Sequence, residues 1–273
     1  MSKKQEEIAE FWYQKALLLT DESQYLECFQ CLERAVAADP THVQSLYAIA
    51  PHYLHGIGVQ KNLPEASRWL RKAAELGFSP AQDKLGIMYE HGIGVAKNWR
   101  EAGKWYLMAA TKGFADAQYH LGVIYGNGQG FPIDYKESAR WCRRAAEQGQ
   151  PEAQFTLGRM YMEGFEGVPQ DMEEAAKWLR KAAEQGDAES QLYIGLLFEH
   201  GDGVPQDLEE AARYYSLSAE QGNAEGQSGL QRINFILGRH SISMEPLPDE
   251  DDWQYQIRRL AEQTRFEPPG KLH

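Results

Sequence analysis

The sequence predicts an all-α solenoid, a chain of helix pairs stacked one on the next. A pattern in which more than a dozen positions agree returns about every 36 residues, and a fixed period in this range is typical of stacked supersecondary units. Apolar residues follow helical spacing in both halves of each copy, and glycines and N-cap residues separate the halves. The five copies span residues 45–77, 81–113, 117–149, 153–186 and 190–222.

The first half of each copy predicts one amphipathic helix. In the second copy, Ala81, Leu85 and Tyr89 lie four residues apart and form one apolar stripe. Gly86 lies beside Leu85, where a side chain would keep the partner helix away. The sequence from Gly92 to Gly94 ends this helix, because glycine adopts positive φ without strain.

The second half predicts another helix with its own start signal. Asn98 is followed three residues later by Glu101, the spacing of a capping box. The same pairs recur in the other copies as Asn62/Glu65, Asp134/Glu137, Asp171/Glu174 and Asp207/Glu210. One aromatic residue per copy lies on the apolar stripe of this helix, and we interpret these residues as core rather than as a ligand-stacking ladder. They are Trp69, Trp105, Trp141, Trp178 and Tyr214.

Charge and composition limit the partners and the compartment. The net charge is −12, and no basic stripe is present, so nucleic acid and acidic membrane surfaces are not expected partners. No segment approaches the ~18 apolar residues of a membrane span, and the first residues lack a signal-peptide core. The three cysteines, Cys28, Cys31 and Cys142, are expected to be free thiols. We therefore expect a cytoplasmic protein.

No motif predicts a catalytic or metal site. Cys28 and Cys31 have the spacing of half a zinc site, but no second ligand pair accompanies them. His55, His91 and His200 precede the first loop glycine of their copies, where a helix C-terminus favours a cationic or donor side chain. We predict no cofactor, no metal and no enzymatic activity.

The repeating unit resembles the Sel1-like repeat, a relative of the tetratricopeptide repeat with a longer loop between its two helices. The resemblance covers residues 45–222 and rests on the positions named above. It implies a right-handed α/α superhelical solenoid that serves as a protein-interaction scaffold and has no catalytic residues. The resemblance also implies an alternative, because some family members have been associated with binding or hydrolysing β-lactam-like ligands.

The ends of the chain depart from this unit. Residues 1–42 resemble an ordinary tetratricopeptide helix pair that caps the five repeats of 43–225. Residues 226–240 begin a degenerate sixth repeat in which the helix is expected to end early. In 241–273 we expect an acidic linker, a short amphipathic helix and an extended tail. The apolar stripe of that helix, Trp253, Ile257 and Leu260, could cap the last repeat or occupy the concave groove, and we favour the cap.

In repeats of this kind the first helix of each pair lines the concave side. Positions two, six, nine and ten residues after the leading Ala or Ser of each copy are then expected to stay out of the core and to face that groove. Large apolar groups recur at the first of these positions in four of the five copies, which indicates a partner-binding surface. The alternative is that they pack against the neighbouring repeat. The predicted partner-binding residues are Tyr47, Leu54, Ile87, Glu90, Tyr119, Val123, Phe155, Arg159, Met162, Leu192, Leu196 and Glu199.

From these residues we predict a monomeric, non-enzymatic adaptor that holds a peptide or helix of another protein in its groove. Regulation and neutralisation of a toxin are both compatible with such a surface. The alternatives are a small-molecule-binding or hydrolytic protein of the β-lactam-binding type, and a purely structural subunit of a larger assembly.

Overall fold

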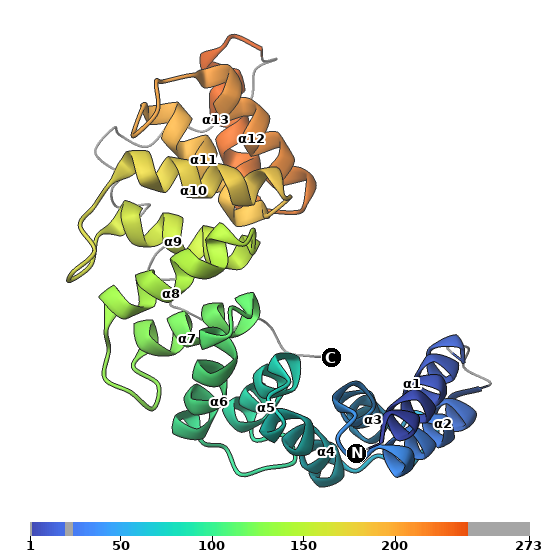
Figure 1. Ribbon diagram of the computed structural model, residues 1–273. Coiled ribbons are helices and arrows are strands. Elements are labelled where there is room, and N and C mark those ends of the chain that lie inside the picture. Colours follow the sequence, from blue (N-terminus) through green and yellow to red (C-terminus); the bar gives the residue numbers. More distant parts are fainter. Residues whose placement is uncertain (1, 20–23, 240–273) are drawn as a thin grey trace. The chain divides into compact units, whose positions relative to one another are not determined.

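A computed structural model describes residues 2–19 and 24–239 of the chain. These residues form an all-α repeat solenoid with no β-strand in the described part; a single β-bridge joins Phe165 and Val168 in one loop. The helices are α1 (Lys3–Leu18), α2 (Tyr25–Ala38), α3 (Val43–His55), α4 (Leu63–Glu75), α5 (Ser79–His91), α6 (Trp99–Thr111), α7 (Ala115–Asn127), α8 (Tyr135–Glu147), α9 (Pro151–Glu163), α10 (Met172–Glu184), α11 (Ala188–His200), α12 (Leu208–Glu220) and α13 (Ala224–Ile236) (Figure 1). The expected linker, helix and tail in 241–273 lie outside the described residues.

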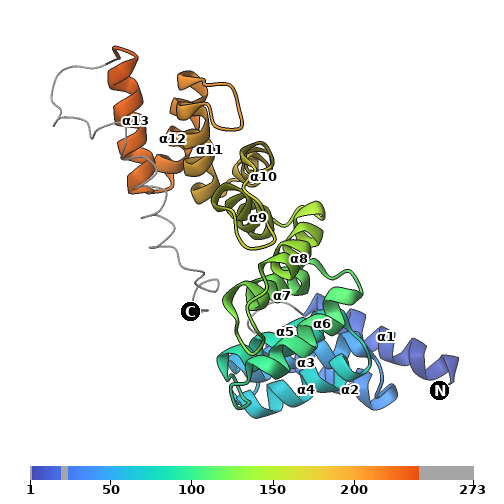
Figure 2. The same ribbon diagram turned by 90° about the vertical axis from the view of Figure 1, so that its left-hand side faces the viewer.

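The helices belong to two compact units. Unit 1 consists of Met1–Ile124 and Gly128–Pro132, and unit 2 consists of Tyr125–Asn127 and Ile133–His273. Within unit 1 the pairs α1–α2, α3–α4 and α5–α6 pack together, and within unit 2 the pairs α9–α10 and α11–α12 do the same. In unit 2, α13 packs against α12 and extends the stack by one further helix (Figure 2). We call the first helix of each pair the A helix and the second the B helix, and count α13 as an A helix.

Each B helix of the five copies begins with the predicted N-cap residue. Its side chain accepts a hydrogen bond from the backbone N–H of the glutamate three residues later, for example Glu101 N–H to Asn98 Oδ1 at 3.1 Å. The predicted capping box is only half realised, because these glutamates form ion pairs one turn onward instead. The pairs are Glu65–Arg68, Glu101–Lys104, Glu137–Arg140, Glu174–Lys177 and Glu210–Arg213, at 2.6–3.2 Å.

The glycine predictions at the helix contacts are confirmed. A Cβ added at Gly86 would lie 2.5 Å from the Tyr106 ring, and one added at Gly158 would lie 2.7 Å from Leu179. Both contacts join the A and B helices of one pair, so a side chain would force those helices apart. The loop glycines Gly92 and Gly94 have φ of 73° and 68°, which favours glycine there.

The glutamine of the repeat pattern joins the A helices α5, α7, α9 and α11 each to the B helix before it. Gln82 Nε2 donates to the Ala74 carbonyl at 2.9 Å, and Gln191 Nε2 donates to the Ala183 carbonyl at 3.2 Å. These carbonyls lie in the last helical turn, and each also accepts the backbone N–H of the glycine that follows the helix, from Gly77 to Ala74 at 2.9 Å and from Gly186 to Ala183 at 3.0 Å. Gln82 and Gln191 are buried, and the same bond recurs at Gln118 and Gln154. The repeated glutamine therefore adds a side-chain hydrogen bond at the end of each of these B helices and ties that end to the next A helix.

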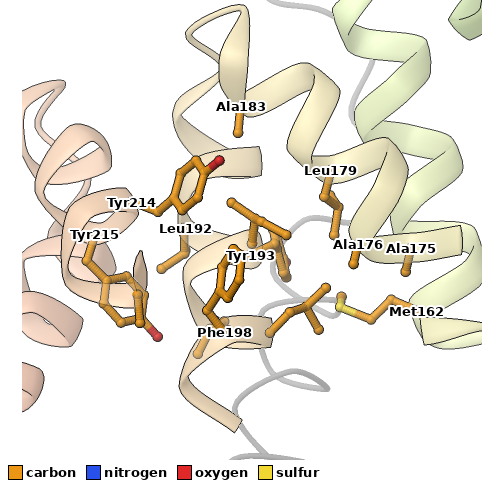
Figure 3. Close-up of a cluster of buried hydrophobic side chains, with 14 of the residues drawn as sticks. Met162, Ala175, Ala176, Leu179, Ala183, Leu192, Tyr193, Phe198, Tyr214 and Tyr215 are labelled. Carbon is orange, nitrogen blue, oxygen red and sulfur yellow. The ribbon is translucent and has the colours of Figure 1, made fainter. Parts of the chain in front are cut away.

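The repeated aromatic residues of the B helices pack into the core to different degrees. Trp141, Trp178 and Tyr214 are buried, whereas Trp69 and Trp105 are half-buried. In unit 2, Tyr214 joins a hydrophobic cluster in which the A and B helices meet, together with Leu179, Leu192, Phe198 and Tyr215 (Figure 3). The expectation that the last helix ends early is wrong, because α13 has 13 residues, as α11 has.

Candidate functional site

The twelve predicted partner-binding residues lie on the A helices, six in each unit. We call them the A-helix row. In unit 1, Tyr47 and Leu54 lie on α3, Ile87 and Glu90 on α5, and Tyr119 and Val123 on α7. In unit 2, Phe155, Arg159 and Met162 lie on α9, and Leu192, Leu196 and Glu199 lie on α11.

In unit 1 the row is partly open. Tyr47, Leu54 and Ile87 are half-buried, while Glu90, Tyr119 and Val123 are at most 9% exposed. The buried side of Tyr47 packs edge-on against Phe78, with ring centroids 5.4 Å apart. Tyr47 and Leu54 therefore use one side for packing on the hydrophobic core of unit 1.

In unit 2 more side chains of the row are buried than in unit 1. Met162, Leu192 and Leu196 belong to the hydrophobic core cluster, whereas Phe155 and Arg159 are half-buried. The Arg159 guanidinium pairs with Glu163 one turn onward and lies 5.8 Å from the centre of the Phe155 ring. The expectation that the row stays out of the core is wrong at Tyr119, Val123, Met162, Leu192 and Leu196, and Glu90 and Glu199 are also buried. Binding of a partner by the row stays a prediction.

Unit 1 contains a cluster of buried polar side chains that includes Glu90 of the A-helix row. His120 Nδ1 lies 2.8 Å from Asp83 Oδ1, which joins α7 to α5. The Tyr106 hydroxyl, on the B helix α6, donates to Glu90 Oε2 at 2.7 Å. The Tyr106 and His120 rings lie 4.8 Å apart and link the two contacts. The second oxygen of Glu90, Oε1, has His91 Nε2 at 3.6 Å.

The pKa of His120 reflects this cluster. Burial alone lowers the pKa of the imidazole, but the hydrogen bond and charge of Asp83, with the charges of Glu90 and Asp116, outweigh it, so the pKa is raised. The same surroundings raise the pKa of the Tyr106 hydroxyl well above its ordinary value, through burial and then through Glu90. Tyr106 is therefore a neutral hydrogen-bond donor at physiological pH.

Unit 2 repeats part of this arrangement with a different cation. The Tyr215 hydroxyl donates to Glu199 Oε2, as Tyr106 does to Glu90. Arg232, from the following A helix α13, donates two hydrogen bonds to the same carboxylate. Nε donates to Oε1 at 2.7 Å and Nη2 donates to Oε2 at 2.6 Å. Burial raises the pKa of Glu199, but the bonds and charge of Arg232 overcome it, so the pKa is lowered. This bidentate geometry is the strong form of a carboxylate–guanidinium contact.

Neither carboxylate–tyrosine pair was predicted from the sequence, although the sequence carries a signal for both. Glutamate occurs nine residues after the leading position only in the copies of Glu90 and Glu199. Only in those copies does tyrosine follow directly after the repeated aromatic of the B helix, as Tyr106 and Tyr215. The other three copies have Leu54, Gly126 and Met162 at the first position and Leu70, Cys142 and Leu179 at the second. Comparing copies position by position would have linked the two.

Cys28 and His52 are in contact, with Sγ 3.8 Å from Nε2, but no third ligand among the described residues joins them. His55, His91 and His200 end α3, α5 and α11 and are exposed. In residues 2–19 and 24–239, no three His, Cys, Asp or Glu side chains come together as metal ligands. The cysteines are free, and burial raises the pKa of Cys142 to about 12, so its thiol is neutral. No helix of the described residues is long and apolar enough to span a membrane.

The chain belongs to the Sel1 repeat family. The family model for the Sel1 repeat matches residues 1–21, 43–78, 79–114, 115–150, 151–187 and 188–223. The sequence has no match among the curated proteins.

Two solved structures support this assignment. A Sel1 repeat protein from Oxalobacter formigenes is 32% identical, with a TM-score of 0.73 over 94% of this chain and 99% of that one. The antigen c5321 of uropathogenic Escherichia coli, also 32% identical, has a TM-score of 0.77 over 96% of this chain and 53% of its own, so this chain spans about half its length. Pseudomonas aeruginosa PilF, at 17% identity and a TM-score of 0.58 over 86% of this chain and 100% of that one, shares the fold alone. Sel1 repeat proteins are generally protein-interaction scaffolds.

Proposed function

We propose that this protein is a non-enzymatic scaffold that binds a peptide or helix of another protein along the A-helix row. Membership of the Sel1 repeat family supports an interaction role. The observation that favours the row is that five of its residues are only half-buried although three of them, Leu54, Ile87 and Phe155, are wholly apolar. Apolar side chains that recur on one face and remain open to solvent mark a contact surface.

The row offers a partner two kinds of contact. Tyr47, Leu54 and Ile87 give unit 1 an apolar surface bordered by the carboxylate of Glu90. Phe155 gives unit 2 an aromatic face, and the Arg159 guanidinium lies beside it. Aromatic and arginine side chains carry much of the binding energy in protein interfaces. We therefore assign specificity to these residues.

We place the protein in a reducing compartment, the cytoplasm. Three cysteines without a disulfide among the described residues support this assignment.

Site-specific photocrosslinking tests the proposal. A photoreactive phenylalanine analogue at Ile87 in unit 1 or at Phe155 in unit 2, in cells that make the protein, should give a discrete crosslinked product. Leu107, exposed on the B helix α6, is the matched control and should give none. Products from Leu107 alone, or from none of the three positions, would overturn the proposal.

A further inference from the structure

The two buried carboxylates of the A-helix row differ in what neutralises them. Glu199 accepts two hydrogen bonds from the Arg232 guanidinium and one from the Tyr215 hydroxyl. Glu90 has the Tyr106 hydroxyl on Oε2, while Oε1 has only the imidazole of the adjacent His91, at 3.6 Å. Both glutamates are 7% exposed, so their charges are equally removed from bulk water.

The repeat itself shows where the missing cation would lie. Arg232 lies six residues after Gly226, the leading position of the last copy. In unit 1 the residue at the same place in the helix after Glu90 is Val123, six residues after Ala117. An apolar side chain therefore stands where the other unit supplies a guanidinium. No guanidinium of the described residues contacts Glu90.

The balance of charges in unit 1 also indicates that Glu90 lacks a close cation. Asp83 and Glu90 are both buried, and the imidazole of His120 lies on Asp83, at 2.8 Å. A buried carboxylate is costly unless a positive group or several hydrogen bonds compensate it. With His120 protonated, one close cation serves two carboxylates, and Glu90 has only the more distant imidazole of His91 beside the Tyr106 hydroxyl.

Solvent can reach this charge at one edge. The His91 side chain is 41% exposed and borders Glu90 Oε1. The half-buried Ile87, one turn before Glu90 on α5, lies in the same open part of the row. A long basic side chain can approach along this edge and replace the distant imidazole contact.

We propose that Glu90 binds an arginine side chain of the partner, in the way that Glu199 binds Arg232 within the chain. Guanidinium is favoured over ammonium because the internal contact is bidentate and planar, and lysine cannot reproduce that geometry. Tyr106 fixes the carboxylate by holding Oε2, which leaves Oε1 for the incoming group. This inference rests on the proposed function and names the partner chemistry that the unit 1 half of the row recognises.

The test uses the full chain and a minimal probe. N-acetyl-arginine amide is titrated against N-acetyl-citrulline amide, its neutral isostere, while the imidazole resonances of His91 and His120 are followed by NMR. The arginine probe should give saturable shifts with a dissociation constant on the order of millimolar, as suits a single side chain. The citrulline probe should give none.

Three variants complete the test. Glu90→Gln keeps an acceptor for the Tyr106 hydroxyl but removes the charge, and it should weaken binding of the arginine probe at least tenfold. Val123→Arg supplies the cation in cis and should block the probe as Arg232 blocks Glu199. Glu75→Gln, an equal charge change at an exposed site of unit 1, should leave binding unchanged.

Equal shifts with both probes, or unchanged binding in Glu90→Gln, would overturn the inference. If Val123→Arg loses its helical circular dichroism, the comparison of probe binding between Glu90→Gln and Glu75→Gln decides the test by itself. Crosslinking at Ile87 and Phe155 does not depend on Glu90. A crosslinked partner together with a failed arginine titration would therefore refute this inference and leave the proposed function standing.

Discussion

The two units place the same glutamate–tyrosine pair at the same repeat positions and complete it differently. In unit 1 the following A helix contributes His120, whose ring lies 4.8 Å from that of Tyr106 and whose Nδ1 contacts Asp83. In unit 2 the following A helix contributes Arg232, which reaches the carboxylate itself, while Gly229 leaves room against the Tyr215 ring. The same repeat scaffold can thus neutralise a buried carboxylate with its own arginine or leave that carboxylate to bind a partner. The choice depends on one or two side chains of the next helix.

The largest effect is expected from removing the internal cation. Arg232→Met should destabilise unit 2 by about 3 kcal/mol, because it leaves Glu199 buried and without its positive partner. Hydrogen exchange of the α11–α13 amides measures the loss. Arg239→Met is the control, since its pair with Glu209 is exposed and should contribute at most about 1 kcal/mol. Equal losses in the two variants would contradict the importance of burial.

The next effect concerns the close approach of each A helix to its tyrosine. Gly86→Ala should cost roughly 1–3 kcal/mol, because the new Cβ would lie 2.5 Å from the Tyr106 ring. At the same repeat position the first copy has Ala50, and Ala50→Gly should cost about 1 kcal/mol for a different reason, helix propensity. Urea unfolding midpoints with unchanged slopes measure both. A Gly86→Ala protein as stable as the parent would refute the packing argument.

A smaller effect is expected on how the stability of each unit depends on pH. The raised pKa of His120 means that its pairing stabilises the fold fully below about pH 6.5, the ordinary value, and that this contribution is lost as pH rises through the folded pKa. The lowered pKa of Glu199 means that its pairing stabilises fully above about pH 4.5 and is lost as pH falls through the folded pKa. Hydrogen exchange of α5–α7 and of α11–α13 from pH 4 to 9 separates the two trends.

His120→Gln and Glu199→Gln identify the groups responsible for these trends. Each variant should remove the pH dependence of its own unit and leave that of the other unit in place. Other titrating groups would be responsible for the trend in α5–α7 if it persisted in His120→Gln.

The smallest effect is expected at the repeated surface pairs. Lys104→Ala in unit 1 and Lys177→Ala in unit 2 remove equivalent contacts to Glu101 and Glu174. Each should cost at most about 0.5 kcal/mol, because exposed pairs three residues apart on a helix gain little over hydrated ions. Thermal unfolding of the two variants should agree within this range. A clear difference between them would show that these outer faces are not equivalent.

The prediction from sequence was strongest for local features that repeat. The N-caps, such as Asn98 and Asp171, the positive-φ loop glycines and the close approach of Gly86 all follow from the pattern of one copy. The prediction was weakest where a side chain meets the next helix. Leu192 looked like a groove residue because its position lies off the stripe that faces its own B helix, but it joins the core of unit 2.

The sequence by itself determined the all-α repeat fold, the starts of the B helices, the loop glycines and the family. These depend on helical periodicity, caps and glycines, whose effects act within a few residues or between the two helices of one pair. Only the tertiary structure decided which polar side chains become buried together. Glu199 and Arg232 are 33 residues apart in the chain, as Asp83 and His120 are 37 apart, and such pairs meet only when neighbouring A helices pack side by side. Burial then makes the charge of each carboxylate matter, because water no longer screens it.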